Sequence, residues 1–228
     1  MAADIQTMRK KICELGRLLF DRKLTDAFGG NISARVGEQI LITPRYAGAQ
    51  FNWRLKPEQI IVADADGKKL EGSDEMSRES RAHFQLYQEF PLGNGIVHGH
   101  ARNILAFCAA GVPIPPILES NFPMGEIGLC EFAPAITNEL AESVVKALRK
   151  KEAALADLAA CVMAPWHGIF ALAKTVDDAY NAVELIDNAA YIILMTRGLS
   201  SLSTHASSWA ERTAVLKEGI AAYGKPNE

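Results

Sequence analysis

Two histidines separated by one residue, His98 and His100, give the sequence its clearest indication of chemistry. They stand in the stretch Gly-Ile-Val-His-Gly-His, which is typical of a short buried strand. Because residues i and i+2 of a strand project from the same face, both imidazoles are expected to point into one cavity. Imidazole is the commonest protein ligand of divalent transition metals. The pair therefore predicts two metal ligands on one rigid element, and the structural alternative is a hydrogen-bonded histidine pair at a strand end.

A third histidine and a carboxylate complete a candidate metal centre. His167 lies in Ala-Pro-Trp-His-Gly-Ile-Phe, between two apolar runs, and Glu79 precedes the histidine pair. Three histidines with an acid nearby are typical of a catalytic metal site that keeps one position open for substrate. His83 follows Glu79 by one helical turn, so we expect it to support the site by hydrogen bonding rather than to bind metal. His205 is expected to be a surface residue.

Composition excludes several classes of function. The chain has 228 residues, of which 49% are hydrophobic and 22% charged, with a formal net charge of −3. That balance is ordinary for a globular protein and provides no positive field for nucleic acid or anionic lipid. Four dispersed cysteines without a Cys-x-x-Cys motif predict reduced thiols. No signal-peptide pattern and no membrane-length apolar run is found, so a cytoplasmic location is expected.

The apolar spacing predicts the elements that must position these residues. Helices are expected over residues 3–22, 78–90, about 136–150, 177–199 and 207–223, with Ser77 as the N-cap of the second. A central strand–helix unit is expected over residues 95–111. Strands are expected near 32–35, 39–43, 60–63, 95–100, 127–131, 159–163 and 169–173, the last two forming a hairpin that carries His167. The segment 44–56 is expected to be irregular. Alternating elements without a linker predict one α/β domain over residues 1–228, with a mixed sheet covered by helices on both faces.

Several motifs, taken together in their order, resemble the class II aldolase/adducin family, whose members include sugar-phosphate aldolases and epimerases. The similarity runs from about residue 8 to 200. The motifs are Gly29-Gly30-Asn31-Ile32-Ser33, Thr43-Pro44, Ser77-Arg78-Glu79 with His83, His98-x-His100 and His167-Gly168. The resemblance implies a three-layer α/β/α sandwich with a central mixed, largely antiparallel sheet. It also implies a homotetramer with active sites between neighbouring subunits.

The resemblance assigns roles to the candidate metal centre. His98, His100 and His167 would bind a divalent metal, usually Zn²⁺, although Mn²⁺, Co²⁺, Ni²⁺ and Fe²⁺ accept the same ligands. Glu79 would complete the resting coordination and then act as acid/base. Related epimerases have aspartate at that position, so Glu79 favours cleavage of a carbon–carbon bond. A second acid/base is expected on a loop beyond the second histidine, where this chain has Glu119; Tyr223 is a weaker candidate.

The substrate loops of the resemblance predict a small anionic, sugar-like substrate. The family's phosphate-binding positions correspond to Gly30, Asn31, Thr43 and Ser77, while Arg45 and Arg78 replace small residues there. Two guanidinium groups can bind phosphate or carboxylate by bidentate contacts, or can fill the pocket and exclude phosphate. Gly29 and Gly30 have a structural alternative, because a tight turn by itself requires glycine.

These assignments predict a metal-dependent lyase of the aldolase type. It would cleave or form a carbon–carbon bond in a hydroxy-ketone, such as a ketose phosphate or a sugar-acid derivative, through a metal-stabilised enediolate. An epimerase, a dehydratase or a decarboxylase would use the same centre and stays open. A non-catalytic, adducin-like scaffold is a further alternative, which the retained histidines and glutamate disfavour.

Overall fold

The structure, a computed structural model, describes residues 4–72, 75–156 and 158–196. One seven-stranded sheet organises this part of the chain, in the order β4-β3-β2-β1-β5-β7-β6. All neighbouring strands in it pair antiparallel. The strands are β1 (Asn31–Val36), β2 (Gln39–Ile42), β3 (Ile61–Ala63), β4 (Lys69–Glu71), β5 (Gly95–Gly99), β6 (Ala159–Ala164) and β7 (Gly168–Ala173). The expected α/β class with a largely antiparallel sheet is confirmed; among the described residues, parallel pairing is confined to one isolated bridge between Leu129 and Met163.

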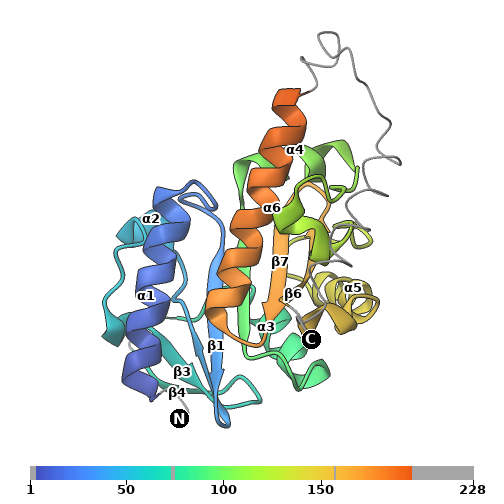
Figure 1. The fold of residues 1–228 in the computed structure, drawn as a ribbon. Helices are drawn as coiled ribbons and strands as arrows, with labels where there is room; N and C mark the ends of the chain where they lie inside the picture. Colours follow the sequence, from blue (N-terminus) through green and yellow to red (C-terminus); the bar gives the residue numbers. More distant parts are fainter. Residues whose placement is uncertain (1–3, 73–74, 157, 197–228) are drawn as a thin grey trace, which may run out of the picture.

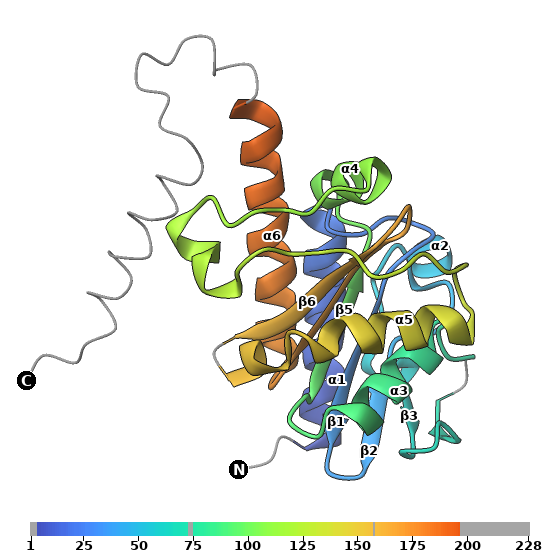
Figure 2. The same cartoon turned by 90° about the vertical axis from the view of Figure 1, so that its right-hand side faces the viewer.

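Helices cover both faces of this sheet (Figure 1 and Figure 2). Residues alternate along β7: Ile169, Ala171 and Ala173 are buried with the helices of one face, and Phe170 and Leu172 with those of the other. This alternation produces the expected three layers. The first face carries α1 (Ile5–Asp21), α4 (Arg102–Ala110) and α6 (Val176–Thr196); the second carries α3 (Ser80–Glu89) and α5 (Asn138–Arg149).

The first helix illustrates how the spacing of apolar residues fixes an element. Ile12, Leu15 and Leu19 recur every three or four residues and are buried against the sheet. Asp4 caps the helix by accepting a hydrogen bond from the backbone N–H of Thr7 at 2.9 Å. The observed α1 therefore agrees with the helix predicted over residues 3–22.

Two expectations were wrong, one for the start of α3 and one for the segment 127–131. Ser77 is not the N-cap of α3: Glu79 occupies that position, because the Ser77 N–H is hydrogen-bonded to the Thr43 carbonyl and holds the chain extended. No strand forms over residues 127–131. That segment makes isolated bridges to two different partners, Ile127 to Ile114 and Leu129 to Met163, so no ladder develops.

Other differences are smaller. The segment 44–56, expected to be irregular, contains the short helix α2 (Ala47–Phe51), and β4 was not predicted. Short 3₁₀ helices occur at η1 (Pro57–Gln59), η2 (Glu119–Met124) and η3 (Glu152–Ala156). The predicted helix over 207–223, with His205 and Tyr223, lies outside the described residues. Within the described ranges, no helix has both the length and the apolar character needed to cross a membrane.

Candidate metal centre

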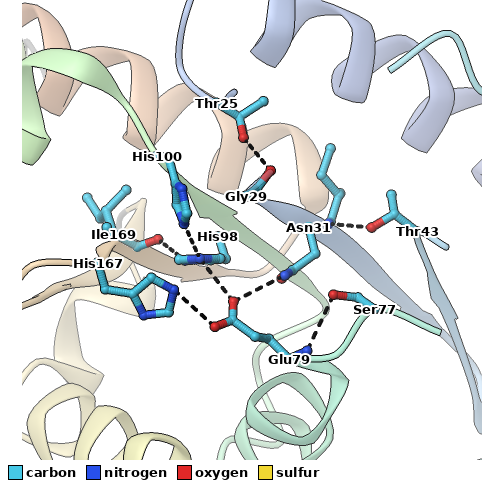
Figure 3. Close-up of polar contacts among 12 residues, drawn as sticks. Thr25, Gly29, Asn31, Thr43, Ser77, Glu79, His98, His100, His167 and Ile169 are labelled. Carbon is cyan, nitrogen blue, oxygen red and sulfur yellow. Dashed lines mark hydrogen bonds and ion pairs between the residues drawn. The ribbon is translucent and has the colours of Figure 1, made fainter. Parts of the chain in front are cut away.

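The centre of the site is His98, near the end of β5. Its ring is fully buried and stacks on Phe170, with 4.2 Å between the ring centroids. Its Nδ1–H donates to the carbonyl oxygen of Ile169 on β7, at 2.9 Å. Because Nδ1 makes this bond, Nε2 is the ring nitrogen that points into the site, where a metal ion could bind it (Figure 3).

His100 reaches the same point from just beyond the end of β5. Its Nε2 lies 3.2 Å from Nε2 of His98, and its Nδ1 lies 3.3 Å from a carboxylate oxygen of Asp26. Because Nδ1 of each ring faces an acceptor, the two Nε2 atoms face each other and are the atoms that a shared cation could bind. Burial, first of all, and the neighbouring His98 lower the pKa of His100 to about 4, so the ring is neutral at pH 7.

His167 closes the cluster from the turn of the β6–β7 hairpin. One ligand atom from each of the three histidines lies within 4.8 Å of the other two. Ligand nitrogens about 2.0–2.1 Å from a tetrahedral Zn²⁺ are roughly 3.3 Å apart, which is close to the His98–His100 separation. One pair thus already has the spacing of a tetrahedral site, and the three nitrogen donors together could hold a divalent transition metal.

Glu79 supplies oxygen atoms to the same point. Its Oε2 lies 3.0 Å from Nε2 of His98 and its Oε1 3.0 Å from Nε2 of His167. The side-chain amide of Asn31, on β1, donates to Oε2 at 3.3 Å. Burial opposes ionisation of this carboxyl, but His98 and His167 hold its pKa well below the ordinary value, so it is a carboxylate at neutral pH.

His83 lies behind the cluster and is not part of it. Its Nδ1 is 2.6 Å from Oγ of Ser33, which also lies 2.8 Å from the Tyr87 hydroxyl. Complete burial lowers the pKa of His83 to about 3. The expected supporting hydrogen bond of His83 is therefore made to Ser33 on β1, and not to one of the residues that face the metal site.

A pocket of about 230 Å³ opens beside the cluster. Its walls include most of the predicted substrate residues together with Glu79, His100 and His167; the predicted substrate residues are Gly30, Asn31, Arg45, Ser77 and Arg78. Thr43 is different, because it is fully buried and its hydroxyl accepts from the Ile32 N–H at 3.1 Å. Gly30 has a backbone reason to be glycine: its φ is +85°, and an added Cβ would lie 2.2 Å from the Thr25 hydroxyl.

The two arginines line this pocket on either side of Tyr46 in the sequence and in contact with its ring. The guanidinium carbon of Arg45 lies 4.8 Å from the Tyr46 ring centroid, and that of Arg78 lies 5.6 Å from it. Arg45 is also paired with Glu75 at 2.6 Å. Arg78 has no carboxylate partner among the described residues, so its charge is available to an anionic ligand.

Glu119, the predicted second acid/base, is not brought to this pocket within one chain. It is exposed on η2 and is not among the lining residues. Sequence reasoning also missed several residues of the site. Asp26, which contacts His100, lies in an ordinary turn, and the exposed apolar residues that line the pocket (Phe28, Tyr46 and Ile136) carry no motif.

A three-layer α/β fold with histidines converging at the end of a central strand defines a protein with a candidate divalent-metal centre. The family model described as Class II Aldolase and Adducin N-terminal domain matches residues 10–194. An L-fuculose phosphate aldolase of Methanococcus maripaludis is 30% identical over 183 residues, covering 80% of this chain and 92% of that protein.

Solved structures agree on the fold. An L-fuculose 1-phosphate aldolase superposes with a TM-score of 0.77 at 23% identity, over 96% of this chain and 98% of that one. YgbL of Klebsiella pneumoniae, which carries the alternative labels aldolase, epimerase and decarboxylase, gives 0.73 at 20% identity, over 94% and 99%. The chain belongs to the class II aldolase and adducin N-terminal domain family, and it is an enzyme of the class II aldolase type. Class II aldolases use a divalent metal, and His98, His100 and His167 form a cluster that could hold one.

Proposed function

We propose that this protein is a metal-dependent lyase that cleaves or forms a carbon–carbon bond in a small anionic hydroxy-ketone. The observation that carries the proposal is the convergence of His98, His100, His167 and Glu79 beside a pocket that two arginines also line. Its relative from Methanococcus maripaludis is named an L-fuculose phosphate aldolase, which favours a ketose phosphate; a sugar-acid derivative is the other candidate substrate.

The three histidines are proposed to hold the metal, with Glu79 as an oxygen donor and Zn²⁺ as the preferred ion. Neutral imidazole nitrogens and one carboxylate suit Zn²⁺, and Mn²⁺, Co²⁺, Ni²⁺ and Fe²⁺ accept the same set. A divalent ion bound there supplies Lewis acidity, which stabilises negative charge that develops on substrate oxygen atoms.

Glu79 is proposed to move the proton at the reacting carbon. Its carboxylate is ionised, buried and held at one oxygen by the Asn31 amide, so it is oriented as a base. A second acid/base serves the departing hydroxyl, and Glu119 is proposed for it. We propose that it comes from a neighbouring subunit, because Glu119 does not line the pocket of its own chain.

The arginine end of the pocket is proposed to bind the substrate's anionic group. Arg78, which has no carboxylate partner in the described part of the chain, offers a guanidinium, and Arg45 can exchange Glu75 for a stronger anionic partner. Asn31, Ser77 and the backbone at Gly30 line the same wall and add donors.

An epimerase, dehydratase or decarboxylase is the alternative. The same histidines and Glu79 would serve each of them, and YgbL, which resembles this chain in fold, carries two of these labels. A decarboxylase would release carbon dioxide from a 3-oxo acid, and an epimerase would leave the composition of its substrate unchanged.

Four organisational proposals accompany the activity. The chain would function as a single class II aldolase-like domain over residues 1–228, assembled as a homotetramer with sites between subunits. We propose a cytoplasmic location and no nucleic-acid partner, in agreement with the net charge of −3.

The first experiment is to follow consumption of dihydroxyacetone phosphate by the Zn²⁺-loaded protein with a panel of short aldehydes, beside a chelator-treated sample. Chelator-sensitive consumption is the expected result. Absence of consumption by protein with stoichiometric metal would reject the phosphate-dependent aldolase reaction. Carbon dioxide release from 3-oxo acids would then test the decarboxylase.

A further inference from the structure

The loop that precedes β1 is tied to the histidine cluster through one carboxylate, that of Asp26. Its Oδ1 accepts the backbone N–H groups of Phe28 at 2.7 Å and of Gly29 at 2.8 Å. Its Oδ2 lies 3.3 Å from Nδ1 of His100. The carboxylate thus folds the loop with one oxygen and faces the imidazole with the other.

The same loop is packed directly against the His100 ring. A Cβ added at Gly29 would lie 1.9 Å from ring atoms of His100, so only glycine allows the backbone to approach this closely. The loop is secured on its other side, where the Trp53 indole N–H donates to the carbonyl of Asp26 at 3.0 Å and the Thr25 hydroxyl donates to the carbonyl of Gly29 at 2.8 Å. The position of Oδ2 relative to His100 is therefore well defined.

Which nitrogen of His100 carries the proton determines what the ring can bind. An ionised carboxylate only accepts, so the Nδ1 atom facing it must be the protonated nitrogen. Nε2 then keeps its lone pair, and that lone pair points toward Nε2 of His98, 3.2 Å away. A carboxylate on the outer nitrogen of a metal-binding histidine fixes the tautomer and orientation and increases ligand basicity.

We infer that Asp26 is a positioning residue for the metal centre: its carboxylate holds His100 in the tautomer that binds metal, and it joins this ligand to the loop that carries Phe28 and Gly30 into the substrate pocket. The inference rests on the metal site of the proposed function. It gives His100 a partner, Asp26, that itself touches neither metal nor substrate. The loop and the ligand are held by one group, so the two move together.

The test compares Asp26→Asn with the wild type in metal affinity. Asparagine keeps the Oδ1 acceptor for the loop N–H groups but presents an NH₂ to Nδ1 of His100. Two donors then face each other, unless the imidazole proton moves to Nε2, which removes the lone pair from the site. Competition with a chromophoric chelator for Zn²⁺ is expected to show about 10- to 100-fold weaker binding.

Asp64→Asn is the matched control. Asp64 also folds a turn, accepting the N–H groups of Asp66 at 3.1 Å and Lys68 at 2.9 Å, and it makes no hydrogen bond to a histidine among the described residues. Its variant is expected to bind Zn²⁺ as the wild type does. The thermal unfolding midpoint of each metal-free protein separates loop folding from metal positioning.

The outcomes are distinct. Weak Zn²⁺ binding by Asp26→Asn with a metal-free unfolding midpoint like that of Asp64→Asn supports the inference. Wild-type affinity in Asp26→Asn overturns it, and so does weak binding that comes with a lower unfolding midpoint than that of Asp64→Asn. Failure of the wild type itself to bind stoichiometric Zn²⁺, with no difference from His98→Ala, would instead reject the proposed metal site.

Discussion

Glu79 is the residue on which the proposed chemistry depends most directly. Replacing it by glutamine keeps the size of the side chain but removes a carboxylate that His98 and His167 hold ionised. We expect turnover to fall by about 10²- to 10⁴-fold, the usual contribution of a general acid/base. Steady-state kinetics measure this, with metal content and melting temperature recorded alongside. Glu126→Gln, which changes an exposed acid outside the pocket, is the control; full turnover in Glu79→Gln with metal retained would contradict the role.

His83 makes a prediction about pH rather than catalysis. Its pKa is lowered to about 3 by burial, against about 6.5 in an unfolded chain, so protonation favours unfolding. As pH falls from about 6.5 to 5, the free energy of unfolding of the metal-free protein should decrease. Each histidine of this kind contributes at most about 1.4 kcal/mol to that decrease per pH unit. His83→Gln cannot take up this proton and should show a shallower slope in urea unfolding at several pH values. Equal slopes for the variant and wild type would show that His83 is protonated in the folded protein.

Sequence reasoning worked best where backbone geometry alone decides which side chains meet. Strand alternation was enough to bring His98 and His100 to one point, and the hairpin turn was enough to deliver His167. Asp26 could not be found in this way. Its contact with His100 depends on the loop folding back across β5, which no spacing within the sequence records.

At the scale of the elements, α4 begins without a capping side chain of its own. Its N-cap is Ala101, and the free N–H groups of Asn103 and Ile104 are instead accepted by the carboxylate of Asp187 on α6, at 3.0 and 3.2 Å. Asp187 also accepts from the Asn103 side-chain amide at 2.8 Å. A cap supplied by another helix fixes the direction in which the chain leaves β5, immediately after His100.

Asp187→Ala should therefore destabilise the fold by about 1–2 kcal/mol, the usual cost of losing a helix cap. Chemical denaturation measures the change in the free energy of unfolding. Asp177→Ala on the same helix is the comparison: Asp177 is half-exposed and forms an ion pair with Lys11, so its loss should cost less than about 1 kcal/mol. If the two variants were equally stable, the buried carboxylate would contribute no cap.

The elements themselves were predicted where their own residues determine them. The helical spacing of α1 and the apolar hairpin of β6 and β7 are local patterns, and both formed as expected. The expected strand over 127–131 failed because a strand needs a continuous partner, and Ile127 and Leu129 each pair with a different segment. The start of α3 moved for a similar reason: the Thr43 carbonyl, distant in sequence, holds Ser77 extended.

At the scale of the whole molecule, the pocket and Glu119 lie apart in one chain. Glu119 is exposed on η2, while Glu79 lies in the pocket wall. The family resemblance predicts that both residues belong to one active site. They can meet there only if Glu119 comes from a neighbouring subunit. The proposed homotetramer with shared sites thus makes a prediction that a monomeric active site does not.

Subunit mixing tests that prediction. Glu79→Gln and Glu119→Gln are each expected to be nearly inactive as pure assemblies. If each site takes Glu79 from one subunit and Glu119 from its neighbour, random mixed assemblies contain intact sites, about a quarter of the total. Unfolding and refolding the two variants together should therefore restore roughly that fraction of wild-type turnover, whereas combining them without subunit exchange should not.

Restoration would place Glu119 in its neighbour's site. Mixed assemblies, verified by differently tagged subunits, that stay inactive would exclude a site shared in this way, and full activity of Glu119→Gln alone would remove Glu119 from the chemistry altogether.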